Sequence, residues 1–101
     1  MINLTDYTFN EFIQRNDFTP ILVMFTSTRC GPCKAMYPIL DSLKNEIKII
    51  FTKVDTDLSP TLVSYFKIQS VPTLILINNG NLLRRTGFLG SKQEIINFIK
   101  G

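Results

Sequence analysis

The segment ILVMFTSTRCGPCKAMYPIL, residues 21–40, decides the fold. Its first five residues are apolar, a pattern typical of a short strand covered on both faces, and we expect that strand at residues 20–26. Apolar residues then recur at helical spacing and predict a helix at residues 33–45. Pro38 should kink this helix, because proline lacks an amide hydrogen. The CGPC sequence at residues 30–33 therefore lies where a buried strand gives way to a helix.

The rest of the chain predicts alternating strands and helices. The Asn-Gly pair at residues 79–80, between two apolar runs, is a strong signal for a tight hairpin. Thr8 and Glu11 fit a capping box at one helix, and Ser59 is expected to cap another, with Pro60 as its first residue. The further strands are expected at residues 1–4, 48–54, 73–78 and 82–86, and the further helices at residues 8–14, 60–66 and 91–100.

This order of elements, β-α-β-α-β-α-β-β-α, predicts the α/β class. A parallel beginning and an antiparallel hairpin at the end give a mixed central sheet of about five strands, flanked by four helices on its two faces. The 101 residues are the size of one ordinary domain and too few for two. We therefore expect a single domain over residues 1–101.

The charge and the hydropathy of the chain argue against several classes of function. The net charge of +3 is mild, and the one adjacent basic pair, Arg84-Arg85, is expected on a solvated face, so no nucleic-acid surface is predicted. The apolar runs are far shorter than the roughly 18 residues of a membrane span. The N-terminus lacks the basic start and the apolar stretch of a signal peptide. We expect no membrane partner and a cytoplasmic location.

Two cysteines and no histidine limit the chemistry of the chain. A structural zinc site takes four ligands, usually Cys or His, and one chain offers only two of them, so we expect no metal. Haem attachment through C-x-x-C-H is excluded because Lys34 follows Cys33. Redox chemistry or a passive disulfide remains.

At the start of a helix, the CGPC sequence is suited to disulfide exchange. Unpaired backbone N–H groups and the positive end of the helix dipole stabilise a thiolate on Cys30, the nucleophilic form. Pro32 fits the first helical turn, and Cys33 lies one turn deeper, within bonding reach. We expect Cys30 to attack a substrate disulfide and Cys33 to release the substrate from the mixed disulfide. An inert disulfide or two idle thiols would be the alternative.

Several motifs in this order resemble the thioredoxin family, over residues 4–98. They are the apolar strand at 21–25, the CGPCK sequence at 30–34, Pro38, Val54-Asp55, Val71-Pro72-Thr73, Asn79-Gly80 and Gly87. The resemblance implies the thioredoxin fold and a protein-disulfide reductase with no cofactor beyond its own disulfide. It also implies disulfide-containing protein substrates and a separate flavin-dependent reductase that restores the dithiol. We expect the chain to be a monomer.

The same resemblance assigns roles around the two cysteines. Pro72 is expected to follow a cis peptide bond and to face the disulfide. The backbone of Val71 would pair with an extended substrate segment, as in strand addition, and Gly87 and Phe88 would form the rim of that surface. The further supporting residues expected beside the cysteines are Arg29, Gly31 and Pro32.

Three positions depart from the family pattern. Arg29 replaces the usual tryptophan, Met24 a buried aspartate, and Phe51 the lysine that pairs with that aspartate. An apolar pair in place of a buried ion pair is compatible with stability. The missing carboxylate and the added cation both favour the Cys30 thiolate, unless Arg29 points away into solvent. We therefore expect a Cys30 pKa below the family's value of about 7 and a potential less reducing than about −270 mV.

Two alternatives to a general reductase remain open. The altered residues around Cys30 also fit a specialised redox carrier that serves one partner. A thioredoxin-fold binding module whose cysteines are incidental would belong to another functional class. Loss of function in Cys30→Ser separates the carrier from the module, because a module should survive that change.

Overall fold

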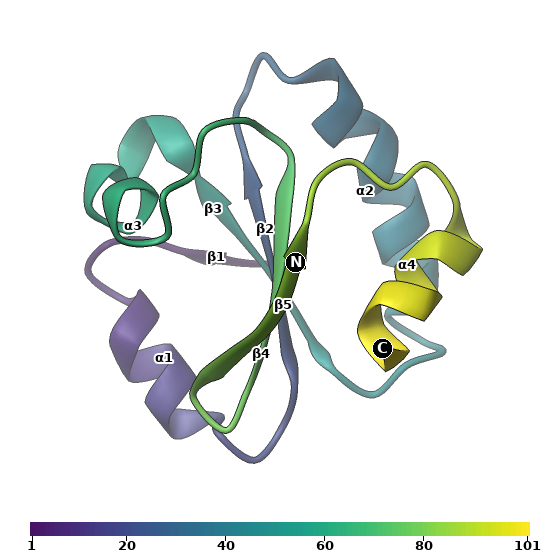
Figure 1. Ribbon diagram of the computed structural model, residues 1–101, viewed down its shortest axis with the longest axis horizontal. Helices are drawn as coiled ribbons and strands as arrows, with labels where there is room; N and C mark the ends of the chain where they lie inside the picture. Colours follow the sequence, from purple (N-terminus) through teal and green to yellow (C-terminus); the bar gives the residue numbers. More distant parts are fainter.

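Five strands form one sheet in the order β1-β3-β2-β4-β5 in the computed structural model, which describes residues 1–101 (Figure 1). The strands are β1 (Ile2–Leu4), β2 (Ile21–Thr26), β3 (Ile50–Asp55), β4 (Thr73–Asn78) and β5 (Asn81–Thr86). The helices are α1 (Phe9–Arg15), α2 (Gly31–Leu43), α3 (Pro60–Tyr65) and α4 (Lys92–Lys100), with a 3-10 turn, η1, at Thr56–Leu58. The predicted order of strands and α-helices is confirmed.

The sheet is mixed, as the sequence predicts. β1 and β2 both pair with β3 in parallel, whereas β4 is antiparallel to β2 and β5 is antiparallel to β4. These directions bring the C-terminal ends of β2 and β5 and the start of β4 to one end of the sheet. There, Phe25 is opposite Thr73, and Leu74 is opposite Thr86. The loops that leave these strand ends are therefore neighbours.

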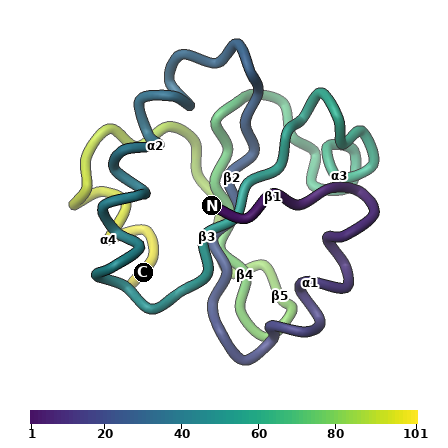
Figure 2. The backbone as a smooth tube through the Cα atoms, turned by 180° about the vertical axis from the view of Figure 1, so that it is seen from behind, coloured from purple at the N-terminus to yellow at the C-terminus, as the bar shows by residue number.

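Two helices cover each face of the sheet. α2 and α4 lie on one face and α1 and α3 on the other, as Figure 1 shows and Figure 2 confirms from behind. β2 runs through the middle, and all six of its residues are buried. Burial on both faces explains why its sequence is a continuous apolar run.

Alternate residues of β2 belong to two separate hydrophobic clusters. Leu22 and Met24 pack with buried side chains of α2 and α4, whereas Val23 and Phe25 pack with those of α1 and α3. Full burial of one such side chain contributes roughly 1.5–3 kcal/mol, so both faces hold the helices firmly. The first cluster also contains both cysteines, which places the CGPC sequence on the side of α2 and α4.

The turn between β4 and β5 follows the prediction. Asn79 and Gly80 have φ values of 53° and 76°, which are the left-handed values that a two-residue type I′ hairpin requires at both central positions. Asparagine and glycine reach that region at the lowest cost. This dipeptide therefore fixes where the chain reverses.

Two predicted helix caps are wrong. Thr8 precedes α1, but its hydroxyl accepts the N–H of Thr5 (3.0 Å) instead of an N–H of the helix, so no capping box with Glu11 forms. Ser59 precedes α3, with Pro60 as the first helical residue as expected, but the Ser59 side chain caps nothing. Its buried Oγ has no hydrogen-bond partner.

Asp6 supplies the cap of α3 from 55 residues away along the chain. Its carboxylate accepts the N–H of Thr61 (3.1 Å) and the N–H of Leu62 (2.9 Å). A carboxylate is favoured at a helix N-terminus by the helix dipole, and its two oxygens satisfy two N–H groups that lack a partner within the helix. The contact ties the segment between β1 and α1 to α3.

The ends of some elements differ from the prediction by one or two residues. α2 runs from Gly31 to Leu43, past Pro38, instead of over residues 33–45, and β3 begins at Ile50. The turn η1 carried no clear signal in the sequence. No α-helix combines the length and the apolar composition that a bilayer crossing requires.

The basic pair on β5 has a structural role that the expectation of a solvated face missed. Arg84 Nη1 donates to the carbonyls of Phe98 (2.8 Å) and Ile99 (3.2 Å) in the last turn of α4. Arg85 Nη1 donates to the carbonyl of Phe66 (2.6 Å), just after α3. Successive strand residues point to opposite faces, so each arginine binds the C-terminal carbonyls of a different helix, where a cation is favoured.

Candidate active site

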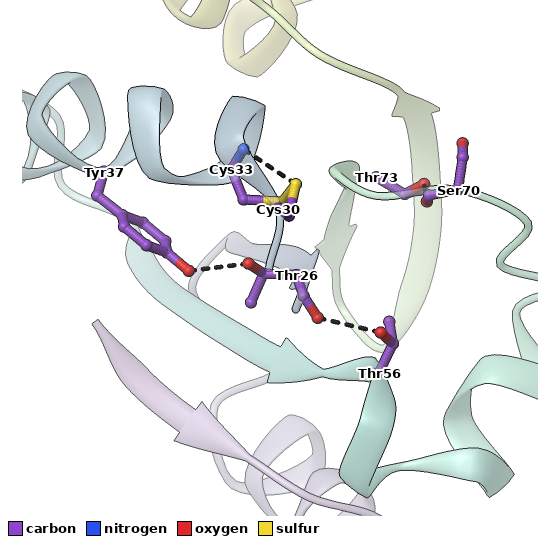
Figure 3. Close-up of a disulfide and its surroundings, with 7 residues drawn as sticks. All are labelled: Thr26, Cys30, Cys33, Tyr37, Thr56, Ser70 and Thr73. Atoms are coloured by element: carbon purple, nitrogen blue, oxygen red, sulfur yellow. Dashed lines mark hydrogen bonds between the residues drawn. A yellow bond between two sulfur atoms is a disulfide. The ribbon is translucent and has the colours of Figure 1, made fainter. Parts of the chain in front are cut away.

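Cys30 and Cys33 form a disulfide at the junction of β2 and α2 (Figure 3). Their Sγ atoms are 2.12 Å apart and their Cα atoms 5.2 Å apart. Cys30 is the N-cap residue of α2, in an extended backbone conformation, and the N–H of Cys33 in the first turn donates to Cys30 Sγ (3.1 Å). The two sulfurs therefore lie within bonding reach, as the spacing predicts.

The residues of the CGPC sequence explain this geometry. Pro32 lies in the first turn of α2, where an N–H would have no partner within the helix, so its missing hydrogen costs nothing. The N–H of Cys33 is one of the unpaired donors of that turn, and Cys30 Sγ accepts it. Negative charge on Cys30 Sγ is stabilised by this hydrogen bond and by the helix dipole.

The two cysteines differ in exposure. Cys30 is 7% exposed, whereas Cys33 is 0% exposed. Gly31 and Pro32 between them are both exposed, so the chain beside Cys30 faces solvent while Cys33 faces the core. Cys30 therefore keeps some contact with solvent, whereas Cys33 has none.

The surroundings of the disulfide within the core are apolar. Met24 and Phe51 are buried in the same cluster as both cysteines, and that cluster contains no carboxylate, amine or guanidinium. The register of β2 and β3 places Lys53, not Phe51, opposite Met24, and Phe51 opposite Leu22. The expectation that Phe51 takes the place of the lysine is therefore wrong, and of the expected ion pair only the carboxylate is missing. A thiolate at Cys30 has no buried negative charge behind it.

Arg29 is the charged residue nearest to Cys30 along the chain. It is exposed, and it takes part in none of the ion pairs of the structure, which join Arg15 to Glu11, Lys44 to Asp41 and Lys92 to Glu46. Water and salt screen an exposed charge. Its effect on the Cys30 sulfur is therefore weaker than that of a buried cation would be.

A groove, here named the Cys30 groove, lies beside the disulfide. Its lining residues are Gly31, Pro32, Ala35, Ser70, Val71, Pro72, Gly87 and Phe88. They come from the first turns of α2, the loop before β4 and the loop after β5, which are the segments that the strand directions bring to one end of the sheet. None of these side chains is charged.

The structure brings the expected binding residues together in this groove. Val71, Pro72, Gly87 and Phe88 all line it, and the Val71-Pro72 peptide bond is cis, as the resemblance implied. A Cβ built on Gly87 would lie 3.8 Å from the carbonyl oxygen of Pro72, which shows how closely the two loops approach. The Phe88 side chain is half exposed and forms an apolar rim.

Two lining residues were not predicted. Ala35 is an exposed residue one helical turn after Gly31, so helical spacing alone would have placed it beside the groove. The carbonyl of Ser70 accepts the hydroxyl of Thr73 (2.7 Å), which fixes the loop before β4 (Figure 3). The place of Ser70 depends on this loop conformation, for which the sequence carries no clear signal.

A hydroxyl pair near the disulfide was also missed. Thr26 Oγ1 and Tyr37 Oη are 2.8 Å apart and join the end of β2 to the second turn of α2 (Figure 3). Thr56 Oγ1 donates to the carbonyl of Thr26 (3.2 Å), and Lys53 Nζ is 5.2 Å from the centre of the Tyr37 ring, within cation–π range. These contacts position the loop that carries Cys30.

The redox group of this site is the disulfide itself. The structure has no cluster of three or more His, Cys, Asp or Glu side chains that could hold a metal ion. Neither cysteine is free, because each is bonded to the other. The chemistry of the site is therefore that of a disulfide, which two electrons and two protons convert into two thiols.

Comparisons with known proteins agree with this geometry. The family model described as Thioredoxin matches residues 1–101. Thioredoxin Y2, chloroplastic, of Arabidopsis thaliana is 40% identical over 93 residues, which are 87% of this chain and 56% of that relative. The thioredoxin of Rickettsia felis is 33% identical over 99 residues, which are 96% of this chain and 93% of that relative. The crystal structure of reduced Schistosoma mansoni thioredoxin pre-protein superimposes with a TM-score of 0.90 at 29% identity and covers 98% of this chain and 94% of that one.

These likenesses establish the fold and the type of activity. The five-stranded mixed sheet with four helices is the thioredoxin fold. The bonded cysteine pair and the thioredoxin relatives show a thiol–disulfide oxidoreductase that reduces protein disulfides and carries no cofactor. The chain spans little more than half of the chloroplast relative and nearly all of the bacterial one. By its sequence, its fold and its disulfide, the chain belongs to the thioredoxin family.

Proposed function

We propose that Cys30 is the attacking thiolate and Cys33 the resolving thiol when this chain reduces protein disulfides. The observation that carries this order is the difference in exposure, because Cys30 keeps some contact with solvent and Cys33 keeps none. The start of α2 supports the same order, since its dipole and its N–H groups stabilise an anion at Cys30.

Electrons and protons balance over two steps. In the first, the Cys30 thiolate bonds to one substrate sulfur, the substrate S–S bond breaks, and the other sulfur leaves as a thiolate that takes a proton from solvent. In the second, Cys33 loses its proton and attacks Cys30 Sγ, which releases the remaining substrate sulfur as a second thiol. The substrate gains two electrons and two protons, and the chain is left with the Cys30–Cys33 disulfide.

We also propose that the pKa of Cys30 lies below the value usual in the family, and that the disulfide is less reducing. The apolar surroundings of Met24 support this, because no buried carboxylate disfavours the thiolate. Arg29 adds a favourable charge, which its exposure weakens. A stabilised thiolate stabilises the reduced form, and this makes the couple a stronger oxidant.

The Cys30 groove is proposed as the place where the substrate segment lies. Its position beside the disulfide supports this, as does its uncharged lining from three neighbouring segments. The backbone of Val71 would pair with an extended segment as an added strand does, beside Pro72. Gly87 and Phe88 would border the segment on its other side. Gly31 and Pro32 leave the approach to Cys30 open, since both are exposed.

Further proposals concern the molecule as a whole. A separate flavoprotein reductase would restore the dithiol, because the chain has no cysteine beyond Cys30 and Cys33 that could accept electrons. We propose a single domain over residues 1–101 that acts as a monomer. The cytoplasm is the proposed location, because its reducing conditions keep such thiols available for attack.

Turnover of insulin disulfides with dithiothreitol as the electron donor tests the proposed order. The chain should accelerate the reaction above dithiothreitol alone, and both Cys30→Ser and Cys33→Ser should reduce turnover to that background. Binding of a partner without turnover, unchanged in Cys30→Ser, would contradict the proposal and favour a binding module. Slow insulin turnover beside fast, Cys30-dependent reduction of one protein would instead identify a dedicated carrier.

A further inference from the structure

The charged residues closest along the chain to those that line the Cys30 groove are all cations. Within three positions along the chain of any lining residue, every charged side chain is Lys or Arg, and none is Asp or Glu. These cations are Arg29, Lys34, Lys67, Arg84 and Arg85. The two arginines of β5 bind helix carbonyls, so the cations available to a bound molecule are the other three.

Arg29 and Lys34 are the two that flank the disulfide. Arg29 directly precedes Cys30, and Lys34 directly follows Cys33. Both side chains are exposed, and neither takes part in an ion pair. An incoming carboxylate would therefore displace no existing partner and would remove little water from a buried surface.

Carboxylates also follow β1 and β3 at this end of the sheet, and both strands lie on the other side of β2 from the groove. Asp55 ends β3, opposite Thr26 in the register, and Asp57 follows it in η1. β3 and β4 lie on opposite sides of β2, and the groove lies on the side of β4 and β5. The Asp55 carboxylate already accepts the N–H of Asp57 (2.9 Å). Neither of these acidic groups forms an ion pair with Arg29 or Lys34.

We propose that the Cys30 groove selects protein disulfides with Asp or Glu beside the cysteine that is attacked. The uncharged lining holds the extended segment, and carboxylates beside its cysteine pair with Arg29 and Lys34, the residues just before and just after the CGPC sequence. Complementary charge also speeds encounter, to a degree that falls with ionic strength. This inference rests on the proposed reductase function and adds a substrate class to it.

Three disulfide peptides test the selection. They share one sequence and differ only in two residues that flank the cysteine, which are glutamates, glutamines or lysines. The reduced chain is mixed with each peptide in a single turnover, the reaction is quenched with acid, and the second-order rate constant is measured by chromatography. We expect the glutamate peptide to react about 1.4- to 5-fold faster than the glutamine peptide for each cation engaged, the range for exposed ion pairs. The lysine peptide should be the slowest, and the differences should shrink in 0.5 M salt.

Matched variants assign the preference to the two cations. Arg29→Gln/Lys34→Gln should bring the glutamate-to-glutamine rate ratio close to one. Lys48→Gln removes an exposed, unpaired cation before β3, at the opposite end of the sheet, and should leave that ratio unchanged. A ratio rather than a rate is compared because Arg29 also acts on the reactivity of Cys30 toward every peptide.

The outcomes separate this inference from the function on which it rests. Equal rate constants for all three peptides, or a ratio that the double variant leaves unchanged, would overturn the charge selection while the reductase function stands. Failure to reduce even the glutamine peptide would overturn the reductase function itself, and the selection with it.

Discussion

Met24 shows how one buried side chain sets the electrostatics of the site. It lies in the same apolar cluster as both cysteines. Met24→Asp would place a carboxylate there, and a like charge disfavours a nearby thiolate. We expect the pKa of Cys30 to rise in Met24→Asp, measured by the ultraviolet absorbance of the thiolate as a function of pH in the reduced protein.

Met24→Asn is the matched control for that variant, because asparagine has the size and polarity of aspartate without its charge. The pKa of Cys30 should rise in the aspartate variant and change little in the asparagine variant. If both variants titrate as the unaltered protein does, the apolar surroundings do not set the reactivity of Cys30.

Single residues with local signals were predictable, and residues whose role depends on packing were not. The place of Cys30 at a helix start follows from a strand, a CGPC sequence and a helix that are contiguous along the chain. The bond between Thr26 and Tyr37 depends on how β2 packs against α2. Nothing in the sequence around Thr26 or around Tyr37 indicates which hydroxyl the other would bind, so this contact was not predictable.

At the scale of elements, α3 owes its start to a residue far away in the sequence. Asp6 caps it with two hydrogen bonds. Asp6→Ala should lower the free energy of unfolding by about 0.5–2 kcal/mol, the range for lost helix caps, as measured by urea denaturation. Asp17→Ala is the control, because Asp17 is an exposed residue that lines the same surface pocket as Asp6 and has no side-chain hydrogen bond or ion pair in the structure. Equal stabilities of the two variants would contradict the role of Asp6.

Ser59 provides the opposite expectation at the same helix. Its buried Oγ has no partner, and a buried polar group without a hydrogen bond costs roughly 1–3 kcal/mol. Ser59→Ala should therefore leave the urea midpoint unchanged or raise it. If Ser59→Ala instead lowered the free energy of unfolding by about 1 kcal/mol, the result would support the predicted cap by the Ser59 side chain.

The last turn of α4 depends on Arg84 of β5. Arg84→Met keeps much of the apolar stem but removes the two hydrogen bonds to the carbonyls of Phe98 and Ile99. We expect a loss of about 1–2 kcal/mol in the free energy of unfolding, again measured in urea. Lys48→Met, an exposed cation without such bonds, should stay within about 0.5 kcal/mol of the unaltered chain. If Arg84→Met also stayed within that range, the two hydrogen bonds from Arg84 would contribute nothing to stability.

At the scale of the whole molecule, the order of elements was predictable because each signal is periodic and local. The apolar run of β2, the helical spacing in α2 and the Asn-Gly turn each identify one element, and the order of elements then fixes a mixed sheet. Contacts between distant segments were not predictable in this way. Asp6 caps a distant helix, and Arg84 and Arg85 bind the C-terminal carbonyls of two helices. Each of these contacts joins parts of the chain that only the finished fold brings together.

The central claim is that Cys30 attacks the substrate disulfide and that Cys33 resolves the mixed disulfide. Cys33→Ser should stop the reaction after the first step, so reduced Cys33→Ser mixed with a protein disulfide should form a stable covalent complex through Cys30. Intact mass spectrometry should show one chain bound to one substrate, a complex that dithiothreitol separates. The matched variant Cys30→Ser should form none. A complex of equal yield on Cys33 in the Cys30→Ser variant, or no complex in either variant, would contradict the account.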